Sequence, residues 1–466
     1  MSGNLKSWLP KRFNQVSAFI ARCLICFFEA GSLKSYGVLV EDLTKQTQMS
    51  FAMAGLILPL QHSLSYILAP VGTALANRFG YRTITVIGGF LAGLGYISNG
   101  IFPLSPIVLI IFCACIGCGY GIVYAPSFVF LKVNIPEDAT FGIVQILTDQ
   151  FIYIGICILP VLFDKFQDIY GTQGALLLFG GLNLHIVVAG VLMRPLSPSD
   201  ENENRGNKDD QKNYTDSHGI IGAYEKDDEL QPLGSSTLIQ HGTPDGESAT
   251  NELHGQSDFN PEDQLCGFYA YISVFNRNKS ALFLTIIAFF HAFNISGWVL
   301  FLVPIGKEKG LLSSQAVLLS SVAGVGALFG RVLCIILFWK EVHNPFYYFG
   351  LSAIVQCLSF TCLALVGNNY TKLVIASFIT GVPFGVFSAA IGSMCALKVS
   401  SSDFSRTVEL VFVSVAVGTE IGGGVSGAVY DYSWSGVPVF LVIAASDLFL
   451  VFLSFVWWLW EENTTD

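Results

Sequence analysis

Charged and titratable side chains that interrupt long apolar stretches are the residues best suited to chemistry in this chain. They are Arg22, Glu29, Lys34, Asp149, Arg331, Glu409, Glu420 and Asp447, with His62, His185 and His291. Where such a stretch crosses a lipid bilayer, an ionised group costs at least about 2.5–3.5 kcal/mol, so it faces a cavity or a partner. Buried cations bind anions and buried carboxylates bind protons, which is the chemistry of a solute pathway.

Two of the cations are suited to hold a carboxylate. The Lys34 ammonium is a compact point charge, and the Arg331 guanidinium binds a carboxylate with two parallel hydrogen bonds. Each has an alternative. Lys34 is close enough in sequence to Glu41 and Asp42 to extend toward a membrane surface, and Arg331 can be an anchor or part of a structural ion pair.

Two carboxylates are candidates for proton binding. Glu409 precedes Glu420 by three helical turns, so both lie on one helix face. Arg406 can pair with Glu409 at the i,i+3 spacing, which leaves Glu420 without a local partner. Glu420 then either pairs with Arg331 or carries a proton. Asp149, in "ILTDQFIYIG", is the second proton-binding candidate.

Other polar residues of the apolar stretches have less specific signals. His291 and Asn294, in "FFHAFNISGW", can contact a solute, and a structural core histidine is the alternative for His291. Arg22 and Glu29 are seven residues apart on one helix face, so mutual neutralisation is expected. The sequence has no phosphate-binding loop, nucleophile elbow or metal-binding helix motif. We therefore expect no enzyme activity, no cofactor, no metal and no nucleic acid partner.

The composition places these residues in membrane helices. Only 12% of the 466 residues are charged and 52% are hydrophobic, whereas soluble domains carry about 25% charged residues. A membrane-spanning helix needs about 20 apolar residues. Twelve continuous stretches of this kind predict an all-α membrane protein: 16–39, 52–74, 83–103, 105–131, 140–163, 174–194, 280–305, 312–338, 346–367, 372–396, 407–429 and 437–460.

Charge divides the chain into two halves and fixes its expected orientation. The stretch from Ser199 to Gln264 has 16 acidic and 4 basic residues, a composition typical of disorder. With the N-terminus inside, short inner loops carry twelve Lys and Arg against five outside, so both termini are predicted to be cytoplasmic. The predicted regions are an N-terminal tail, a six-helix bundle, a disordered acidic cytoplasmic loop, a second six-helix bundle and a tail: 1–15, 16–194, 195–277, 278–460 and 461–466.

The turn between the second and third stretches resembles the signature loop of the major facilitator superfamily. The matching residues of "GTALANRFGYR" are Gly72, Asn77, Arg78, Gly80 and Arg82. The resemblance implies a gating loop whose glycine lets helices approach and whose arginines cap helix ends of the opposing bundle. Asn77 stands where that family usually has aspartate.

Longer segments resemble the monocarboxylate transporter family of that superfamily. They are "NRFGYRTITVIGGFLAGLGYI", "IGCGYGIVYAPS", "YGTQGALLLFGGLNLHIVVAGVLMRP" and "GVSGAVYD". The resemblance implies that Lys34 is the first-helix lysine and Arg331 the eighth-helix arginine that engage a substrate carboxylate. The aspartate that proton-coupled members have one turn before that arginine is replaced here by Ala327.

These patterns predict a divergent transporter with the major facilitator fold. We expect it to move a small organic anion, most simply a monocarboxylate, by alternating access, with H⁺ as a possible co-substrate. Facilitated diffusion of a neutral or zwitterionic solute, such as an aromatic amino acid, is one alternative, and a non-transporting membrane sensor or scaffold is another. The resemblance also implies residence in the plasma membrane and a single-span immunoglobulin-like chaperone as a partner.

Overall fold

The computed structural model describes residues 3–135, 138–193, 271–342 and 344–465, and all regular structure within these ranges is helical. Most of the acidic loop predicted for 195–277 lies outside the described residues. Its last part, 271–277, differs from the prediction because it is already helical. The all-α prediction is confirmed for the described part of the chain.

The described residues of the N-terminal half form eight helices: α1 (Gly3–Thr47), α2 (Phe51–Ile57), α3 (Leu60–Ile67), α4 (Ala69–Phe79), α5 (Tyr81–Ile101), α6 (Pro106–Asn134), α7 (Asp138–Asn183) and α8 (His185–Leu192). The C-terminal half contains α11 (Lys279–Glu308), α12 (Ser313–Trp339), the π-helical η1 (Phe346–Gly350), α13 (Leu351–Leu365), α14 (Tyr370–Lys398), α15 (Ser401–Ser433) and α16 (Gly436–Thr465).

The number of membrane spans agrees with the prediction when a bent helix pair is counted as one span and one very long helix as two. Ten described helical stretches are long and apolar enough to cross a membrane, and a bent pair adds an eleventh. One of the ten, Val144–Leu192, has 49 residues, which at about 1.5 Å per residue is more than twice the roughly 30 Å of a bilayer core. Its chain reverses at Gly171, whose φ is 69°. Two spans therefore lie within it, so the described residues contain the predicted twelve.

The second span is not the single helix predicted for 52–74. It consists of α2, α3 and α4, and its two parts meet at an angle of 51° after Ile67. Pro59 and Pro70 lie at the two breaks. Proline cannot donate the helical hydrogen bond and its ring clashes with the preceding turn, which explains the breaks.

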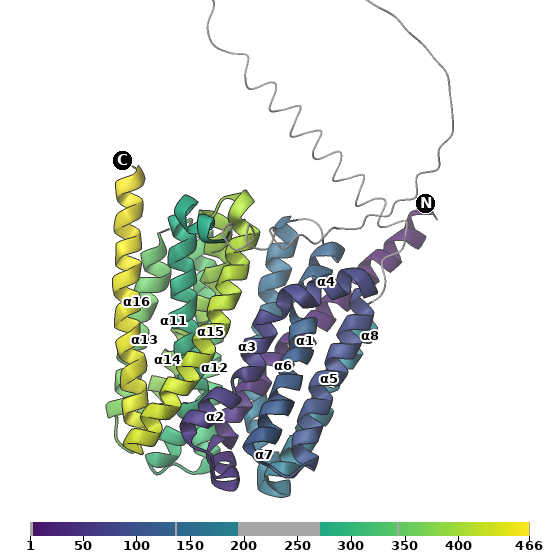
Figure 1. Ribbon diagram of the computed structural model, residues 1–466. Coiled ribbons are helices and arrows are strands. Elements are labelled where there is room, and N and C mark those ends of the chain that lie inside the picture. The colour runs from purple at the N-terminus through teal and green to yellow at the C-terminus, as the bar shows by residue number, and fades with distance from the viewer. Residues whose placement is uncertain (1–2, 136–137, 194–270, 343, 466) are drawn as a thin grey trace, which may run out of the picture. The chain divides into compact units, whose positions relative to one another are not determined.

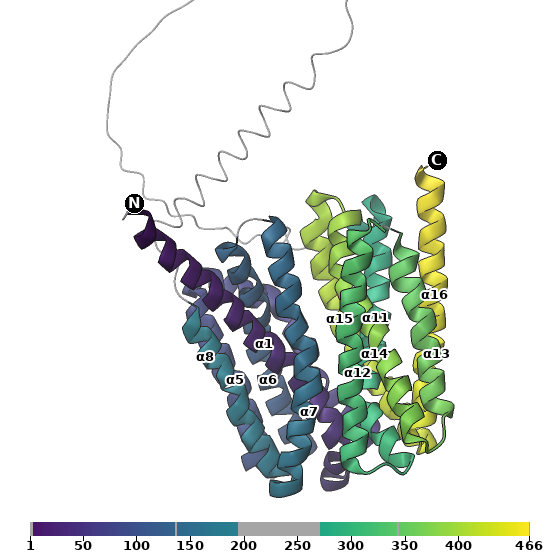
Figure 2. The ribbon, with the colours of Figure 1, turned by 180° about the vertical axis from the view of Figure 1, so that it is seen from behind.

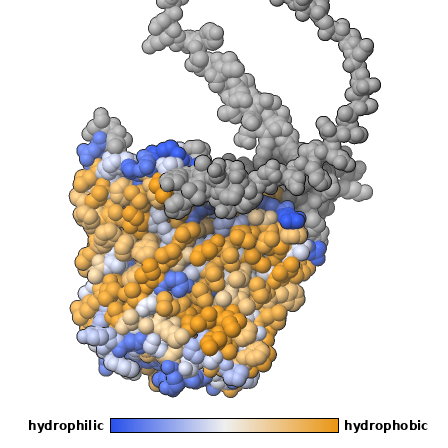
Figure 3. All heavy atoms as spheres, viewed as in Figure 1, coloured by the Kyte–Doolittle hydropathy of each residue, from blue (hydrophilic) through white to orange (hydrophobic). Residues whose placement is uncertain are grey.

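Both helical halves belong to one compact unit. Figures 1 and 2 show α1–α8 on one side of it and α11–α16 on the other, with the N- and C-terminal ends of the chain at the same end of the helices, which we call the termini end. In Figure 3 apolar side chains cover the middle of the visible surface and polar side chains gather toward its two ends. This pattern is typical of a helical protein surrounded by lipid.

Candidate functional site

Lys34 is buried at the contact between the two halves. It lies on α1 and is 1% exposed. Its Nζ donates a hydrogen bond of 3.0 Å to the backbone oxygen of Trp298 on α11 and lies 3.6 Å from the centre of the Trp298 ring. No carboxylate of the described residues is within ion-pair distance of this amine. Lys34 is thus a buried amine held by a ring face and a carbonyl, without a carboxylate partner among the described residues.

A second cationic centre links the halves through Asp149 of α7. Arg22 of α1 lies 3.4 Å from one Asp149 oxygen, and Arg331 of α12 lies 3.5 Å from the other. Arg331 also donates a 2.8 Å hydrogen bond to the Asp149 backbone oxygen. Because two guanidinium groups share one carboxylate, the cluster keeps one excess positive charge. The expected Arg22–Glu29 pair was wrong, and the carboxylate partner of Arg331 is Asp149 rather than Glu420.

Aromatic side chains connect Lys34 to Arg331 through a series of contacts. The Trp298 ring lies 4.4 Å from that of Phe384 on α14. The Tyr153 hydroxyl of α7 donates to the Phe384 backbone oxygen at 3.3 Å and bonds to Ser388 Oγ at 2.6 Å. The Arg331 guanidinium carbon lies 5.5 Å from the Tyr153 ring centre. Lys34, Trp298, Phe384, Tyr153 and Arg331 therefore form a continuous chain of contacts across the two halves.

His291 lies beside this aromatic chain, whereas Asn294 is engaged elsewhere. Both His291 ring nitrogens are buried without a hydrogen-bond partner among the described residues, and the ring stacks on Phe387 at 4.9 Å. Asn294 donates to Asp447 Oδ1 at 2.7 Å and accepts from Ser446 Oγ at 2.5 Å. These contacts join α11 to α16 inside the C-terminal half, so the structure does not bring Asn294 together with Lys34 and Arg331.

Glu29 and Glu420 approach the interface between α3 and α15. Glu29 Oε1 lies 2.8 Å from His62 Nδ1 and accepts from Ser65 Oγ at 3.4 Å. Glu420 Oε1 is buried without a hydrogen-bond partner within the described ranges. The sequence named Glu420 as a proton-binding candidate, but it did not anticipate His62 as the partner of Glu29.

The two halves are joined firmly at the end opposite the termini. Asp431, near the end of α15, accepts 2.8 Å hydrogen bonds from the backbone amides of Phe51 and Ala52 at the start of α2. Lys307 of α11 lies 3.6 Å from Glu41 of α1. Figure 1 shows the α2 end of the N-terminal half beside α15 here, far from the ends marked N and C.

Glycines allow this junction to be tight. A Cβ atom on Gly37 would lie 2.2 Å from the Val299 backbone oxygen, and one on Gly55 would lie 2.0 Å from that of Gly423. Real Cβ atoms essentially never come so close to backbone. The α1–α11 and α2–α15 contacts therefore depend on the absence of a side chain, and we call this end of the interface the closed end.

The signature loop has no hydrogen bond or ion pair with the C-terminal half in the described part of the chain. Asn77 accepts a 2.8 Å hydrogen bond from the Tyr81 hydroxyl, and Arg78 lies over the Phe79 ring at 5.3 Å. Gly80 has a φ of 89°, a conformation that favours glycine, and ends α4. A Cβ on Gly72 would lie 2.6 Å from the Gly121 oxygen, so this glycine permits close α4–α6 packing.

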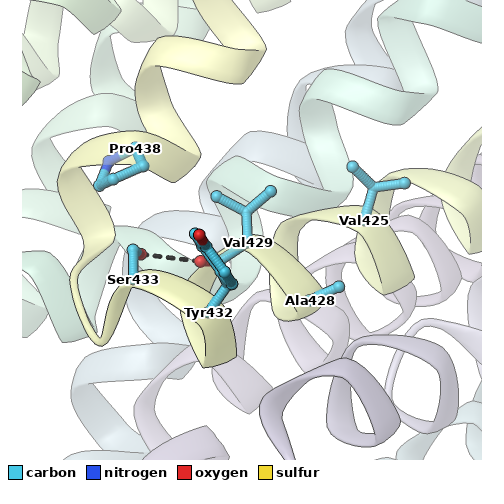
Figure 4. A pocket seen from close by; sticks show the side chains of 6 residues that line it. All are labelled: Val425, Ala428, Val429, Tyr432, Ser433 and Pro438. Carbon is cyan, nitrogen blue, oxygen red and sulfur yellow. Dashed lines mark hydrogen bonds between the residues drawn. The ribbon is translucent and has the colours of Figure 1, made fainter.

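The groove in Figure 4 lies apart from these residues. It has a volume of about 420 Å³ and follows the end of α15 to the start of α16. Its lining residues are Val425, Ala428, Val429, Tyr432, Ser433 and Pro438. The Ser433 hydroxyl donates a 2.7 Å hydrogen bond to the Val429 backbone oxygen. With no charged lining residue, the groove lacks the means to recognise an anion, and we do not place the solute site there.

The comparisons with known proteins decide the family. The family model described as Major Facilitator Superfamily matches residues 19–347. The chain belongs to this superfamily. As one of its members the protein is a membrane transporter and not an enzyme.

Relatives in this superfamily include several monocarboxylate transporters. The chain is 25% identical to monocarboxylate transporter 3 of Gallus gallus over 90% of this chain and 73% of the relative. It is 22% identical to monocarboxylate transporter 4 of Rattus norvegicus over 91% and 79% of the two chains. The resemblance found in four short segments thus extends along most of the sequence.

Solved transporter structures share the fold. A bacterial homologue of the human lysosomal transporter Spinster, described as inward-facing and unoccupied, superimposes with a TM-score of 0.66 at 14% identity over 96% of both chains. A POT family transporter in complex with 5-aminolevulinic acid gives 0.67 at 13% identity, again over 96% of both. Together with the helix count, these similarities confirm the predicted major facilitator fold.

Proposed function

We propose that this major facilitator transporter carries a small organic anion, most simply a monocarboxylate, by alternating access. The observation that carries the proposal is the Lys34 side chain, buried at the interface without a carboxylate partner among the described residues. A buried charge is costly unless it is paired. A solute carboxylate would supply the missing negative charge. The names of the relatives, monocarboxylate transporters 3 and 4, point to the same class of solute.

The second cationic centre supports the same assignment. Arg22 and Arg331 share the single charge of Asp149, so an anion near them meets a positive field. Lys34 belongs to the N-terminal half and Arg331 to the C-terminal half. A ligand that touches both favours states in which the halves close around it, as ligand-driven rocking requires. Trp298 and Tyr153, between the cations, offer faces for the organic part of the solute.

Alternating access is proposed to exchange the partner of Lys34. If both termini are cytoplasmic, as the sequence predicts, the closed end is extracellular and this arrangement corresponds to the state closed to the outside. When the halves rock apart there, α1 moves away from α11 and the Lys34 ammonium leaves the Trp298 carbonyl and ring. A carboxylate arriving from outside can then bind Lys34 in place of Trp298.

Proton coupling is proposed to use a group other than the usual aspartate, since that position is Ala327. Both Asp149 oxygens are taken by guanidinium groups in this state, so we regard Asp149 as a link between halves. Of these two carboxylates, Glu420, with one buried oxygen unpartnered within the described residues, is the better placed to take part in coupling.

A zwitterionic solute is the competing proposal. Glu420 offers a negative group and Lys34 a positive one, a combination that suits an amino acid with both charges. Residence in the plasma membrane and a single-span immunoglobulin-like chaperone are further proposals that rest on the family resemblance alone.

The test is uptake into proteoliposomes reconstituted with the full chain. Labelled L-lactate, pyruvate and phenylalanine are supplied at pH 6 and pH 8, and unlabelled competitors of each solute class are added. Lys34→Ala and Arg331→Ala should each lower anion exchange at least tenfold, because a hydrogen bond to a charged group is worth about 1.5–3 kcal/mol. Lys372→Ala removes an exposed cation and serves as the matched control.

Three outcomes separate the proposals. Exchange of lactate or pyruvate that depends on both cations supports anion transport. Exchange of phenylalanine without either monocarboxylate supports the zwitterion proposal instead. If Lys34→Ala and Arg331→Ala exchange anions as fast as the parent protein, the two cations do not form the solute site and the proposal is wrong.

A further inference from the structure

His62 lies in a small polar cluster at the interface between the halves, on a side of α3 that the proposed solute site does not use. Its Nδ1 is 2.8 Å from Glu29 Oε1 of α1, with side-chain exposures of 12% for His62 and 6% for Glu29. Its other ring nitrogen, Nε2, has no hydrogen bond to a described residue. Glu29 therefore orients the ring from one side and leaves Nε2 available.

The opposite half contributes the third member of the cluster. Ser63, next to His62, donates a 3.1 Å hydrogen bond to the Ala416 backbone oxygen of α15. Glu420 follows Ala416 by one helical turn and so lies on the same face of α15. Its carboxylate lies beside Ser63 and within electrostatic range of His62, and its Oε1 is buried without a partner among described residues.

Other titratable groups stand behind this cluster. The Tyr66 ring packs edge-on against the His62 ring, with 4.9 Å between ring centres, and its centre lies 6.2 Å from that of Tyr124 on α6. Arg22 lies over the Tyr124 ring at 4.3 Å and is paired with Asp149. The carboxylates around His62 are therefore Glu29, in direct contact with the ring, and Glu420 of the other half, within electrostatic range.

We propose that His62 is the residue through which this transporter binds the coupled proton, acting between Glu29 of the N-terminal half and Glu420 of the C-terminal half. Imidazole is the side chain whose charge changes in the physiological pH range. In the neutral ring, Nδ1–H donates to Glu29, so the lone pair lies on Nε2 and that atom takes the proton from water. The proton later leaves from Nε2 to water on the other side, and no bond other than N–H forms or breaks.

The electrostatics connect this proton to the movement of the halves. With His62 protonated, the imidazolium attracts the Glu420 carboxylate and so draws α15 toward α3. With His62 neutral, Glu29 and Glu420 carry like charges toward one another across the same interface. The proton thus favours the arrangement with α3 and α15 in contact, and its loss favours their separation. This assignment rests on the anion-transport proposal, because a coupled proton needs a transported partner.

The experiment separates coupling from transport itself, in proteoliposomes with L-lactate and pyruvate as the probes. Counterflow exchanges labelled for unlabelled solute and requires no net proton movement, whereas accumulation against a gradient is driven by an imposed inward pH gradient. His62→Gln keeps a donor for Glu29 but cannot bind a proton near neutral pH. Its pH-driven accumulation should fall at least tenfold, whereas its counterflow should stay within about twofold of the parent. Glu420→Gln should show the same division.

The control is His185→Gln, which removes the other described histidine of the N-terminal half, bonded to the Leu182 backbone oxygen. It should leave both measurements unchanged. If His62→Gln accumulates solute as well as the parent, or if the parent exchanges lactate and pyruvate but ignores the pH gradient, the assignment of His62 is overturned while anion transport stands. If the parent shows no counterflow of either probe, the anion proposal itself is overturned. A misfolded His62→Gln would lose counterflow too, and Glu420→Gln then decides.

Discussion

Gly37 of α1 touches the Val299 backbone of α11 so closely that a Cβ atom there would lie 2.2 Å from the Val299 oxygen. We predict that Gly37→Ala prevents the halves from meeting at the closed end, because the obstructing atom is backbone and cannot rotate away. Separating the halves relieves the clash without unfolding either one. Counterflow should therefore fall at least tenfold while the unfolding temperature of the detergent-solubilised protein changes little.

Gly181→Ala is the matched control for this prediction, because a Cβ at Gly181 would meet no atom within 4 Å. It should exchange solute at the parent rate. Parent-like counterflow in Gly37→Ala would show that the α1–α11 contact is not required in the transport cycle.

Asp431 closes the same end by accepting hydrogen bonds from the first backbone amides of α2, those of Phe51 and Ala52. Replacing a side chain that caps helix amides by alanine costs about 0.5–2 kcal/mol, which is roughly 2- to 30-fold in an equilibrium. We predict that Asp431→Ala accelerates hydrogen exchange at these two amides by that factor, measured by mass spectrometry on the peptide that contains them.

Ser50 provides a control on the same helix. Its Oγ accepts from the Met53 backbone amide, and this cap lies wholly inside the N-terminal half. Ser50→Ala should speed exchange at Met53 while leaving solute counterflow unchanged, whereas Asp431→Ala should alter both exchange and counterflow. Equal effects of the two variants on counterflow would mean that Asp431 merely caps a helix.

The sequence predicted the positions of the helices well, but it predicted poorly which side chains pair between them. Length and hydropathy locate a span because a helix in lipid must satisfy its backbone hydrogen bonds within itself, which is a local requirement. They did not reveal the breaks at Pro59 and Pro70, since the apolar run continues through both. Proline in a membrane helix can kink or end it, and the packing around it decides which.

Ion-pair partners depend on contacts between helices far apart in the chain. Arg22 and Glu29 share a helix face, yet Arg22 pairs with Asp149 and Glu29 with His62. The Arg22 partner is 127 residues away, so no local spacing could have indicated it. Trp298 could not be predicted for a different reason, because an aromatic residue within an apolar stretch has the same sequence signal as any lipid- or core-facing side chain.

The shared carboxylate of Asp149 leads to a third prediction. Asp149→Asn leaves the Arg22 and Arg331 guanidinium groups buried with no counter-charge, and breaking a buried ion pair typically costs about 3–5 kcal/mol. We expect a large fall in the unfolding temperature. Adding Arg331→Gln to Asp149→Asn should recover part of the loss, because the second change removes one of the unpaired charges.

A partly exposed pair shows what an ordinary ion pair contributes. Lys398 and Glu461 lie 2.9 Å apart with side-chain exposures of 23% and 20%, and such pairs are worth about 0–1 kcal/mol. Glu461→Gln should therefore shift the unfolding temperature far less than Asp149→Asn. Additive effects of the two changes at Asp149 and Arg331 would contradict the coupling that the structure shows.

The pair of Arg277 and Asp403 makes stability depend on pH at the termini end. Arg277 precedes α11 and donates hydrogen bonds of 3.2 and 2.6 Å to the two Asp403 oxygens. These bonds hold the pKa of Asp403 below its usual value. Because the folded pKa is the lower one, the pair stabilises the fold above the unfolded pKa of about 3.9 and loses this contribution as the pH falls further.

We therefore predict that Asp403→Asn lowers the unfolding temperature at pH 7, and that its difference from the parent shrinks as the pH is lowered from about 5 toward 3. The Arg277 side chain is 51% exposed, so the effect should be small and should weaken further in high salt, which screens exposed charges. Arg277→Gln should reproduce both the loss at pH 7 and its disappearance in acid. A difference between Asp403→Asn and the parent that stays constant with pH would instead assign the effect to packing of residues 271–277, because a neutral packing contact does not titrate.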